Sequence, residues 1–182
     1  MNFSVSFNIF NEVEHLFDGG KYEVEEIYKR LPIPVDACIK DEEDQSLGMI
    51  KGYLLYNDCT FSDKCDNQSG DCSAIAEAIC DKKGAVDGLD EYTGVFILDR
   101  IIIHEPNRGL GIGSAIMKNL LSIVQNQFYS MGAVVFYVSD FESQKEFGVE
   151  SQEYKDGTER LIKFYEKCGY KVVKENVMFK SL

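Results

Sequence analysis

The chain has 182 residues, 45% of them hydrophobic, and its 31 acidic and 19 basic side chains give a formal net charge of −12. This length fits one domain with a core that needs no disulfides. The acidic excess argues against a nucleic-acid partner, because phosphate contacts need clustered Lys and Arg, and it is compatible with a cationic substrate. No apolar run approaches the roughly 20 residues that span a bilayer, and residues 1–10 lack the pattern of a signal peptide. We therefore expect a cytoplasmic protein without a membrane partner.

The N-terminal half predicts strands and short helices in alternation. Strict polar–apolar alternation at 2–10 predicts a strand, and two helical patterns separated by Gly19-Gly20 predict two short helices within 11–30. Two further strands, at 35–40 and 49–56, form a predicted hairpin around an acidic turn. A polar segment follows, and residues 72–82 then have helical spacing.

The C-terminal half has a more regular pattern. A long apolar strand is predicted at 92–104, followed by an amphipathic helix from Ile112 that Gly132 ends. A continuously apolar run at 133–138 predicts a buried strand. The remaining predicted elements are a long acidic loop at 139–157, a helix at 158–168, and strands at 171–174 and 176–180.

The cysteines do not form a metal-binding pattern. Four of the six lie between 59 and 80, but no pair has C-x-x-C spacing, and the only histidines are His15 and His104. Structural zinc sites normally use closely spaced ligand pairs. We expect no metal, and a metal-binding module built from these cysteines is the weaker interpretation.

A glycine-rich turn joins the apolar strand to the helix that begins at Ile112. Its sequence is Arg108-Gly109-Leu110-Gly111-Ile112-Gly113. Glycines let the backbone approach a ligand closely, and the first N–H groups of a helix have no partner within it. Such a turn predicts an anion site suited to phosphate oxygens, beside the charge of Arg108.

Two common phosphate-binding motifs do not match this turn. A P-loop would need G-x-x-x-x-G-K-[ST], which the sequence lacks. The dinucleotide fingerprint G-x-G-x-x-G fails from either start, because its last position falls on Ser114 or Ile116. The turn instead has the form R-x-x-G-x-G, with Arg108, Gly111 and Gly113 at the defined positions.

This motif resembles the pyrophosphate-binding motif of the GNAT superfamily of N-acetyltransferases. A second stretch, Phe164-Tyr-Glu-Lys-Cys-Gly-Tyr170, is similar to another signature of that family, and the resemblance extends from Val95 to Phe179. It implies an α+β GNAT fold: a mixed, mostly antiparallel sheet with helices on both faces and a V-shaped splay between the strands around 95–104 and 133–138. It also implies one domain over 1–182 with an inserted helical segment around 57–90, and it is compatible with a homodimer.

The resemblance assigns acetyl-coenzyme A (acetyl-CoA) as the co-substrate. The pyrophosphate would lie against the glycine turn, and backbone groups at the end of the preceding strand would hold the pantetheine arm as an added strand. The implied cofactor-binding residues are Ile102, Ile103, Arg108, Gly109, Leu110, Gly111, Ile112, Gly113 and Ser114.

For catalysis the resemblance favours Tyr165 as the acid that protonates the leaving thiolate, and the weaker alternative is that Tyr165 is a core residue. Asp99 interrupts an apolar strand and is a candidate base, unless it pairs elsewhere. His104 and Glu105 are weaker candidates, and a water chain could replace a dedicated base.

The function that follows is transfer of an acetyl group from acetyl-CoA to a primary amine of a small molecule or peptide, by direct attack. The alternative is a non-catalytic acyl-CoA sensor or interaction module on the same fold. The sequence departs from the family in having no Asn near the start of the last helix. Thr158 stands there and could cap that helix.

Overall fold

The computed structural model of the protein describes residues 2–9, 32–91, 93–128 and 130–182. The two helices predicted within 11–30 lie outside these residues. The described elements are β1 (Phe3–Ile9), β2 (Ile33–Asp41), β3 (Ser46–Tyr56), α3 (Phe61–Asp66), α4 (Gly70–Ile79), β4 (Gly94–Ile103), η1 (Glu105–Asn107), α5 (Ile112–Gln127), β5 (Met131–Tyr137), α6 (Phe141–Phe147), α7 (Gln152–Glu166), β6 (Lys171–Lys174) and β7 (Val177–Ser181).

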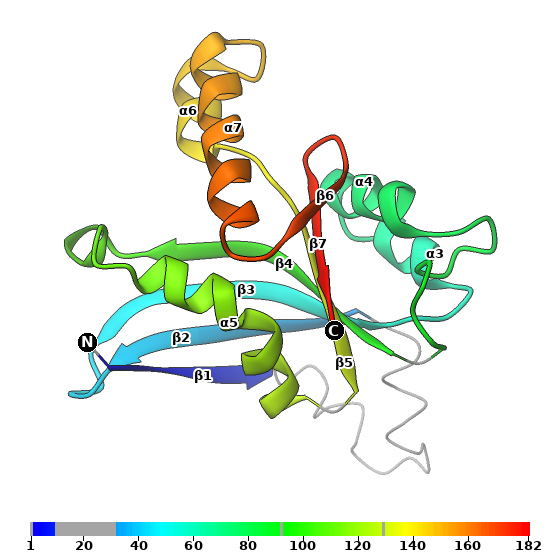
Figure 1. Cartoon of the computed structure of the whole chain (residues 1–182), viewed down its shortest axis with the longest axis horizontal. Helices are drawn as coiled ribbons and strands as arrows, with labels where there is room; N and C mark the ends of the chain where they lie inside the picture. The colour runs from blue at the N-terminus through cyan, green and yellow to red at the C-terminus, as the bar shows by residue number, and fades with distance from the viewer. Residues whose placement is uncertain (1, 10–31, 92, 129) are drawn as a thin grey trace.

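A seven-stranded sheet in the order β1-β2-β3-β4-β5-β7-β6 runs through the centre of the molecule (Figure 1). Neighbouring strands are antiparallel except for the central pair, β4 and β5, which is parallel. The alternation of apolar residues predicts which faces of these strands are buried, because successive side chains of a strand point to opposite faces. In β2, for example, every second residue from Ile33 to Ile39 is buried.

Helices cover both faces of the sheet, and each face has its own core. On one face, α5 packs with residues such as Ile116 and Leu120 against Phe96 and Val134. On the other face, α3 and α4 pack against a second core. Its members include Phe61, Ile75, Val95, Ile97 and Val135. The predicted α+β class, with a mixed, mostly antiparallel sheet and helices on both faces, is confirmed.

The two parallel strands separate partway along their length. β4 pairs with β5 only from Gly94 to Ile97, although β4 continues to Ile103. Beyond that point β5 pairs with β7 alone, as far as Tyr137. This is the predicted V-shaped splay, and it leaves the inner edge of β4 without a neighbouring strand.

The prediction of a loop at 139–157 is wrong, because this segment forms α6 and the first part of α7. Asp140 caps α6 by accepting a hydrogen bond from the N–H of Ser143 at 3.1 Å. Ser151 caps α7 in the same way, accepting from the N–H of Tyr154 at 3.1 Å. Side-chain oxygens of Asp and Ser are preferred at this position, so the caps carried a sequence signal that the acidic composition concealed.

Other elements also differ from the prediction. The segment 57–71 contains the short helix α3, in addition to the expected helix after it. The helix from Ile112 ends at Gln127, and Gly132 lies inside β5. Among the described residues, no helix has both the length and the apolar character needed to cross a membrane.

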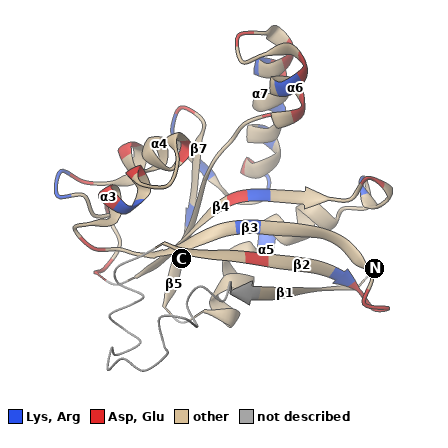
Figure 2. Cartoon of the chain, turned by 180° about the vertical axis from the view of Figure 1, so that it is seen from behind, with Lys and Arg blue, Asp and Glu red and all other residues tan. Residues whose placement is uncertain are grey.

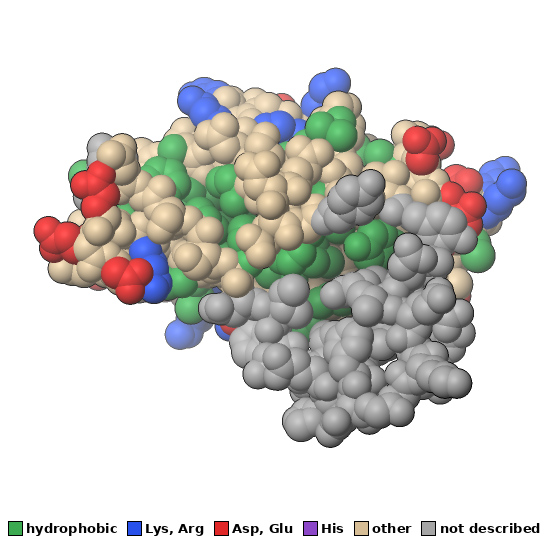
Figure 3. Space-filling model, turned by 90° about the horizontal axis from the view of Figure 1, so that it is seen from below, with side chains coloured by type: hydrophobic (Ala, Val, Ile, Leu, Met, Phe, Trp, Pro, Cys, Tyr) green, Lys and Arg blue, Asp and Glu red, His purple; other side chains and the backbone are tan. Residues whose placement is uncertain are grey.

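Hydrophobic side chains form a band across the face seen in Figure 3, with charged groups around its outside. Part of this face involves β1, whose Phe3, Val5 and Phe7 pack against the α5-side core. The rings of Phe7 and Phe128 meet edge to face, with centroids 5.3 Å apart. The edge strand β1 is therefore tied to the end of α5 through side chains as well as to β2 through its backbone.

Close packing of β3 on β4 depends on a glycine in β3. A Cβ atom placed on Gly52 would lie 2.4 Å from the carbonyl oxygen of Ile97 and 2.6 Å from the ring of Phe96. Both neighbours are buried, so neither can move away without disturbing the core.

We predict that Gly52→Ala lowers the free energy of unfolding by about 2 kcal/mol, as overpacking of a close-packed core typically does. The measurement is urea denaturation followed by circular dichroism. Gly70→Ala is the control, because a Cβ atom at Gly70 meets no atom within 4 Å. Equal stability of the Gly52 variant and the wild type would show that the sheet can shift to admit the methyl group.

Candidate functional site

The glycine turn places the N-terminus of α5 beside the end of β4. Gly109 and Gly111 have φ angles of 77° and 81°, in the left-handed region that favours glycine. Gly111 caps α5 and has no side chain to accept hydrogen bonds from the first turn. The first N–H bonded within the helix is that of Ala115, 2.9 Å from the oxygen of Gly111. The N–H groups of residues 112–114 therefore point out of the helix at its positive end.

The side chain of Arg108, the first residue of this turn, contacts both the end of β4 and α6. Its Nε donates to the carbonyl of Ile103 at 3.1 Å, and Nη2 contacts Oε1 of Glu142 at 3.2 Å. Both partners of the ion pair are exposed, so the pair stabilises the protein little. An anionic ligand at the turn could therefore compete with Glu142 for the guanidinium.

The strand β4 contains a bulge at the point where it separates from β5. Lys51 pairs with Arg100, and the next residue of β3, Gly52, pairs with Leu98, so that Asp99 has no partner across the ladder. Leu98 belongs to the α5-side core, and so do Ile101 and Ile103. The extra residue thus shifts by one position the set of β4 residues that face the α5-side core, from even-numbered residues before the bulge to odd-numbered ones after it. β-Bulges are common next to active sites, where they redirect side chains.

A cleft of about 690 Å³ opens between the separated strands. Its walls come from the second half of β4, the end of β5 with the segment that follows, α7, and the start of α4. The lining residues are Ser69, Asp71, Leu98–Ile103, Arg108, Phe136–Glu142, Leu161 and Tyr165. A cavity of this size fits a small-molecule or cofactor site.

Five of the predicted site residues line this cleft together: Asp99, Ile102, Ile103, Arg108 and Tyr165. The glycine turn lies next to it, since a Cβ atom on Gly113 would be 3.8 Å from Cγ1 of Ile103. The side chain of Ile112, by contrast, is buried in the core. Only the backbone of Ile112 could therefore contact a ligand, as the prediction requires.

Tyr165 belongs both to the core and to the wall of the cleft. Its ring meets that of Phe136 edge to face at 4.7 Å and that of Phe164 at 5.1 Å. Burial, with a smaller effect of Cys168, raises the pKa of Tyr165 to about 12. The phenol is therefore protonated at neutral pH and held in a fixed orientation by aromatic packing.

Asp99 lies on the side of the cleft that faces α4. It contributes to the raised pKa of Tyr53, after the effect of burial. His104 is exposed, and its Nδ1 lies 3.2 Å from the carbonyl of Ser46, while Glu105 begins the short helix η1. Neither of these two weaker candidates lines the cleft.

The sequence suggested that Thr158 caps the last helix, but the cap of that helix is Ser151. Thr158 lies in the middle of α7 and is 4% exposed. Its Oγ1 is 3.4 Å from the N–H of Asp140, at the limit for a hydrogen bond. Sequence reasoning also missed the walls formed by Ser69, Asp71 and residues 136–142. The sequence offered one indication of residues 136–142, namely that they form the end of a buried strand and the segment that follows it.

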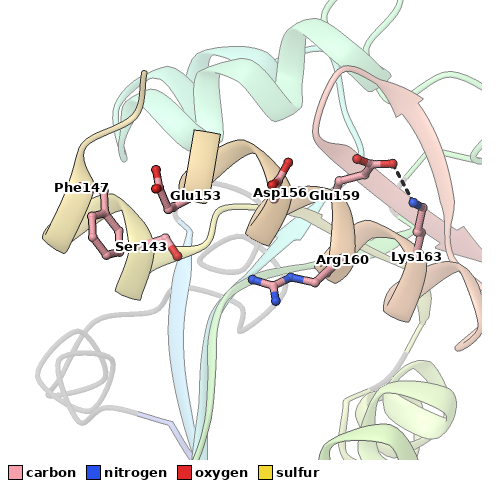
Figure 4. A pocket seen from close by; sticks show the side chains of 7 residues that line it. All are labelled: Ser143, Phe147, Glu153, Asp156, Glu159, Arg160 and Lys163. Carbon is pink, nitrogen blue, oxygen red and sulfur yellow. Dashed lines mark hydrogen bonds and ion pairs between the residues drawn. The ribbon is translucent and has the colours of Figure 1, made fainter. Parts of the chain in front are cut away.

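A second hollow, of about 540 Å³, lies between α6 and α7 (Figure 4). Its lining is mostly charged and includes the ion pair of Lys163 and Glu159, 2.6 Å apart. It contains none of the residues that the two sequence motifs predict. We therefore place the candidate site in the cleft.

Of the four cysteines between 59 and 80, two are buried, Cys80 is partly buried and Cys59 is exposed. Cys65 and Cys72 are buried in the core beneath α3 and α4. Burial raises the pKa of the Cys80 thiol to about 11 and raises the pKa of the Cys65 thiol further, which disfavours the thiolate form that binds metals. Within the described ranges, no group of three or more His, Cys, Asp or Glu is placed to hold a metal ion.

No protein-family model and no curated protein matches the sequence. Solved structures do match: Arabidopsis thaliana NAA60 in complex with acetyl-CoA has 10% identity and a TM-score of 0.46 over 98% of this chain and 100% of that one. Arabidopsis thaliana Naa50 with the bisubstrate analogue CoA-Ac-MVNAL has 14% identity and a TM-score of 0.43, covering 98% and 99%. The spermidine/spermine N-acetyltransferase SpeG from Vibrio cholerae has 11% and 0.42, covering 98% and 95%.

These structures are GNAT acetyltransferases, the family that the two sequence motifs resemble. Identities of 10–14% and TM-scores of 0.42–0.46 do not transfer an activity or a substrate to this chain. The function must therefore be inferred from the site itself.

We predict that Tyr165 stays protonated through the ordinary tyrosine pKa of about 10. The measurement is the ultraviolet difference titration of wild type against Tyr165→Phe. The phenolate signal that the variant loses should appear near pH 12. Since the folded pKa lies above the unfolded one, the neutral phenol favours the folded state, and this contribution changes only above about pH 10. A lost signal near pH 10 would contradict the burial of this phenol.

Proposed function

We propose that the protein is an acyl-CoA-dependent N-acetyltransferase that acts in the cleft between β4 and β5. One observation carries the proposal. The unpaired edge of β4 and Tyr165 line the same cleft, and the outward N–H groups at the start of α5 lie next to it, beside Ile103. An anion site, a strand edge and an acid are the three features that a phosphorylated thioester with an extended arm needs.

The donor would lie along the inner edge of β4. Its pyrophosphate would accept hydrogen bonds from the N–H groups of residues 110–114, aided by the helix dipole. Its amide-containing arm would add to the edge of β4 at Ile102 and Ile103, which have no strand beside them on that side. Arg108, with Gly109 beside it, would then exchange Glu142 for a phosphate oxygen, a stronger and bidentate partner.

The reaction would be direct attack of an amine on the thioester carbonyl. A carbon–nitrogen bond forms, the carbon–sulfur bond breaks, and the leaving thiolate must take up a proton. The phenol of Tyr165 can supply that proton, because its high pKa keeps it protonated until a strong base appears beside it. The phenolate formed in this way would recover its proton from the attacking nitrogen through solvent.

The amine must be neutral when it attacks. Asp99 could accept its proton directly or through water, because it stands at the bulge where the two strands separate. The side chain is exposed, so water has access to this end of the cleft. We propose further that the segment 57–90 is an insertion in a single domain over 1–182, and that its helix α4 forms the acceptor side of the cleft.

The proposal predicts thiol release from acetyl-CoA when a suitable amine is present. Tyr165→Phe should reduce kcat about a hundredfold or more, as loss of a general acid typically does, and leave acetyl-CoA affinity unchanged. Thiol release followed with a disulfide reagent gives kcat, and calorimetric titration gives the affinity.

The matched control is Tyr154→Phe, which removes a phenol from the same helix; Tyr154 does not itself line the cleft, although Ser139, which it contacts, does. Tyr154 contacts Oγ of Ser139 at 3.3 Å, and its loss should leave kcat close to that of the wild type. Full activity of Tyr165→Phe would eliminate Tyr165 as the acid. Binding of acetyl-CoA without turnover of any amine would instead support the non-catalytic sensor.

A further inference from the structure

The cleft contains two carboxylates that nothing in the described chain neutralises. Six charged residues line it: Asp71, Asp99, Arg100, Arg108, Asp140 and Glu142. Arg108 and Glu142 form an ion pair with each other. The guanidinium of Arg100 lies 5.1 Å from the centre of the Phe141 ring, and Asp140 caps α6. Asp71 and Asp99 have neither a hydrogen-bonded nor an ion-paired partner among the side chains that the structure describes.

The two carboxylates come from different elements but line the same cleft, and the charges of both affect the pKa of the Cys72 thiol. Asp99 comes from the bulge of β4, and Asp71 from the first turn of α4. The pKa of the Cys72 thiol is raised, first by burial and then by both Asp99 and Asp71. Asp71 directly precedes Cys72 in the chain, whereas Asp99 reaches the same thiol from β4, and both carboxylates line the one cleft. Figure 2 shows acidic positions on β4 and on the α3–α4 segment.

Aromatic groups border the space near these carboxylates. Tyr137 lines the cleft and is half-buried. Its pKa is raised by burial, with smaller effects that include the charge of Asp71. Tyr53, on β3, responds to Asp99 in the same way. Tyrosine rings beside carboxylates suit an alkyl chain that carries ammonium groups, since the rings pack on its methylenes and attract the cations.

We infer that the acceptor is an amine with a second protonated group, whose reactive nitrogen lies at Asp99 and whose remote ammonium binds Asp71. This inference rests on the proposed transferase function, and it assigns a specificity-determining role to a residue of the 57–90 segment. A singly charged amine would leave one of the two carboxylates unpaired. An acceptor with two cationic groups satisfies both.

Asp71 also has a purely structural effect, because a carboxylate in the first turn of a helix is stabilised by the helix dipole. A loss of activity in a variant would not separate the two roles. A difference between a doubly and a singly charged acceptor of the same length does, since a structural effect would act on both.

The experiment compares diaminobutane with butylamine in the thiol-release assay at low salt, using wild type and Asp71→Asn. Wild type should have a lower KM for the diamine. Asp71→Asn should raise the KM for diaminobutane about fivefold, the effect of losing one exposed ion pair, and leave kcat and all constants for butylamine unchanged. The matched control is Glu77→Gln, on the same helix, which pairs with Lys174 at 3.3 Å away from the cleft.

Equal constants of wild type for the two amines, or an equal loss for both in Asp71→Asn, would overturn the inference and leave the transferase intact. Calorimetric titration with diaminobutane distinguishes a failure of the transferase proposal from a failure of the proposed role of Asp71. Asp71-dependent binding of the diamine, with no thiol release from any amine, would refute the transferase proposal and retain the binding role of Asp71. If diaminobutane does not bind and the enzyme does not prefer it to butylamine, the proposed role of Asp71 is refuted.

Discussion

The site depends on the early separation of two parallel strands. β4 and β5 are hydrogen-bonded only over Gly94–Ile97, yet β4 continues for six more residues. A sheet that stayed paired would leave no cavity and no free strand edge. Because β5 diverges from β4 after Val135 while it stays paired with β7, backbone groups of β4 that would otherwise be satisfied face a cleft. Unpaired backbone groups seek a partner, so this edge favours a ligand with amide groups of its own.

The bulge and the glycine turn adapt the same strand to that cleft. The extra residue at Asp99 keeps Ile101 and Ile103 in the core of the α5 side while a carboxylate stands at the strand separation. At the other end of β4, Gly111 starts α5 with free N–H groups. Under the proposed function, this one strand would carry a polar group for the acceptor at its middle and would lead into an anion site for the donor at its end.

The sequence predicted this arrangement where a local pattern determines structure. The R-x-x-G-x-G turn and the periodicity from Ile112 fixed the strand, turn and helix. The walls of the cleft were not predictable in this way, because Asp71 reaches it only through the packing of α4 on the sheet. The α6–α7 pair was missed for another reason: the caps Asp140 and Ser151 are single residues within an acidic, polar stretch. No local pattern shows whether Tyr165 is core or catalytic, and the structure shows only that it packs against the core and also lines the cleft.

Amide hydrogen exchange with and without acetyl-CoA tests most directly whether the ligand binds where the strands separate. The account predicts slower exchange on addition of acetyl-CoA in the unpaired part of β4, residues 99–103, and around the turn at 109–115. Exchange in α3, on the opposite side of the sheet from α5, should stay the same. Unchanged exchange at both segments, or protection confined to the α6–α7 hollow, would contradict the claim.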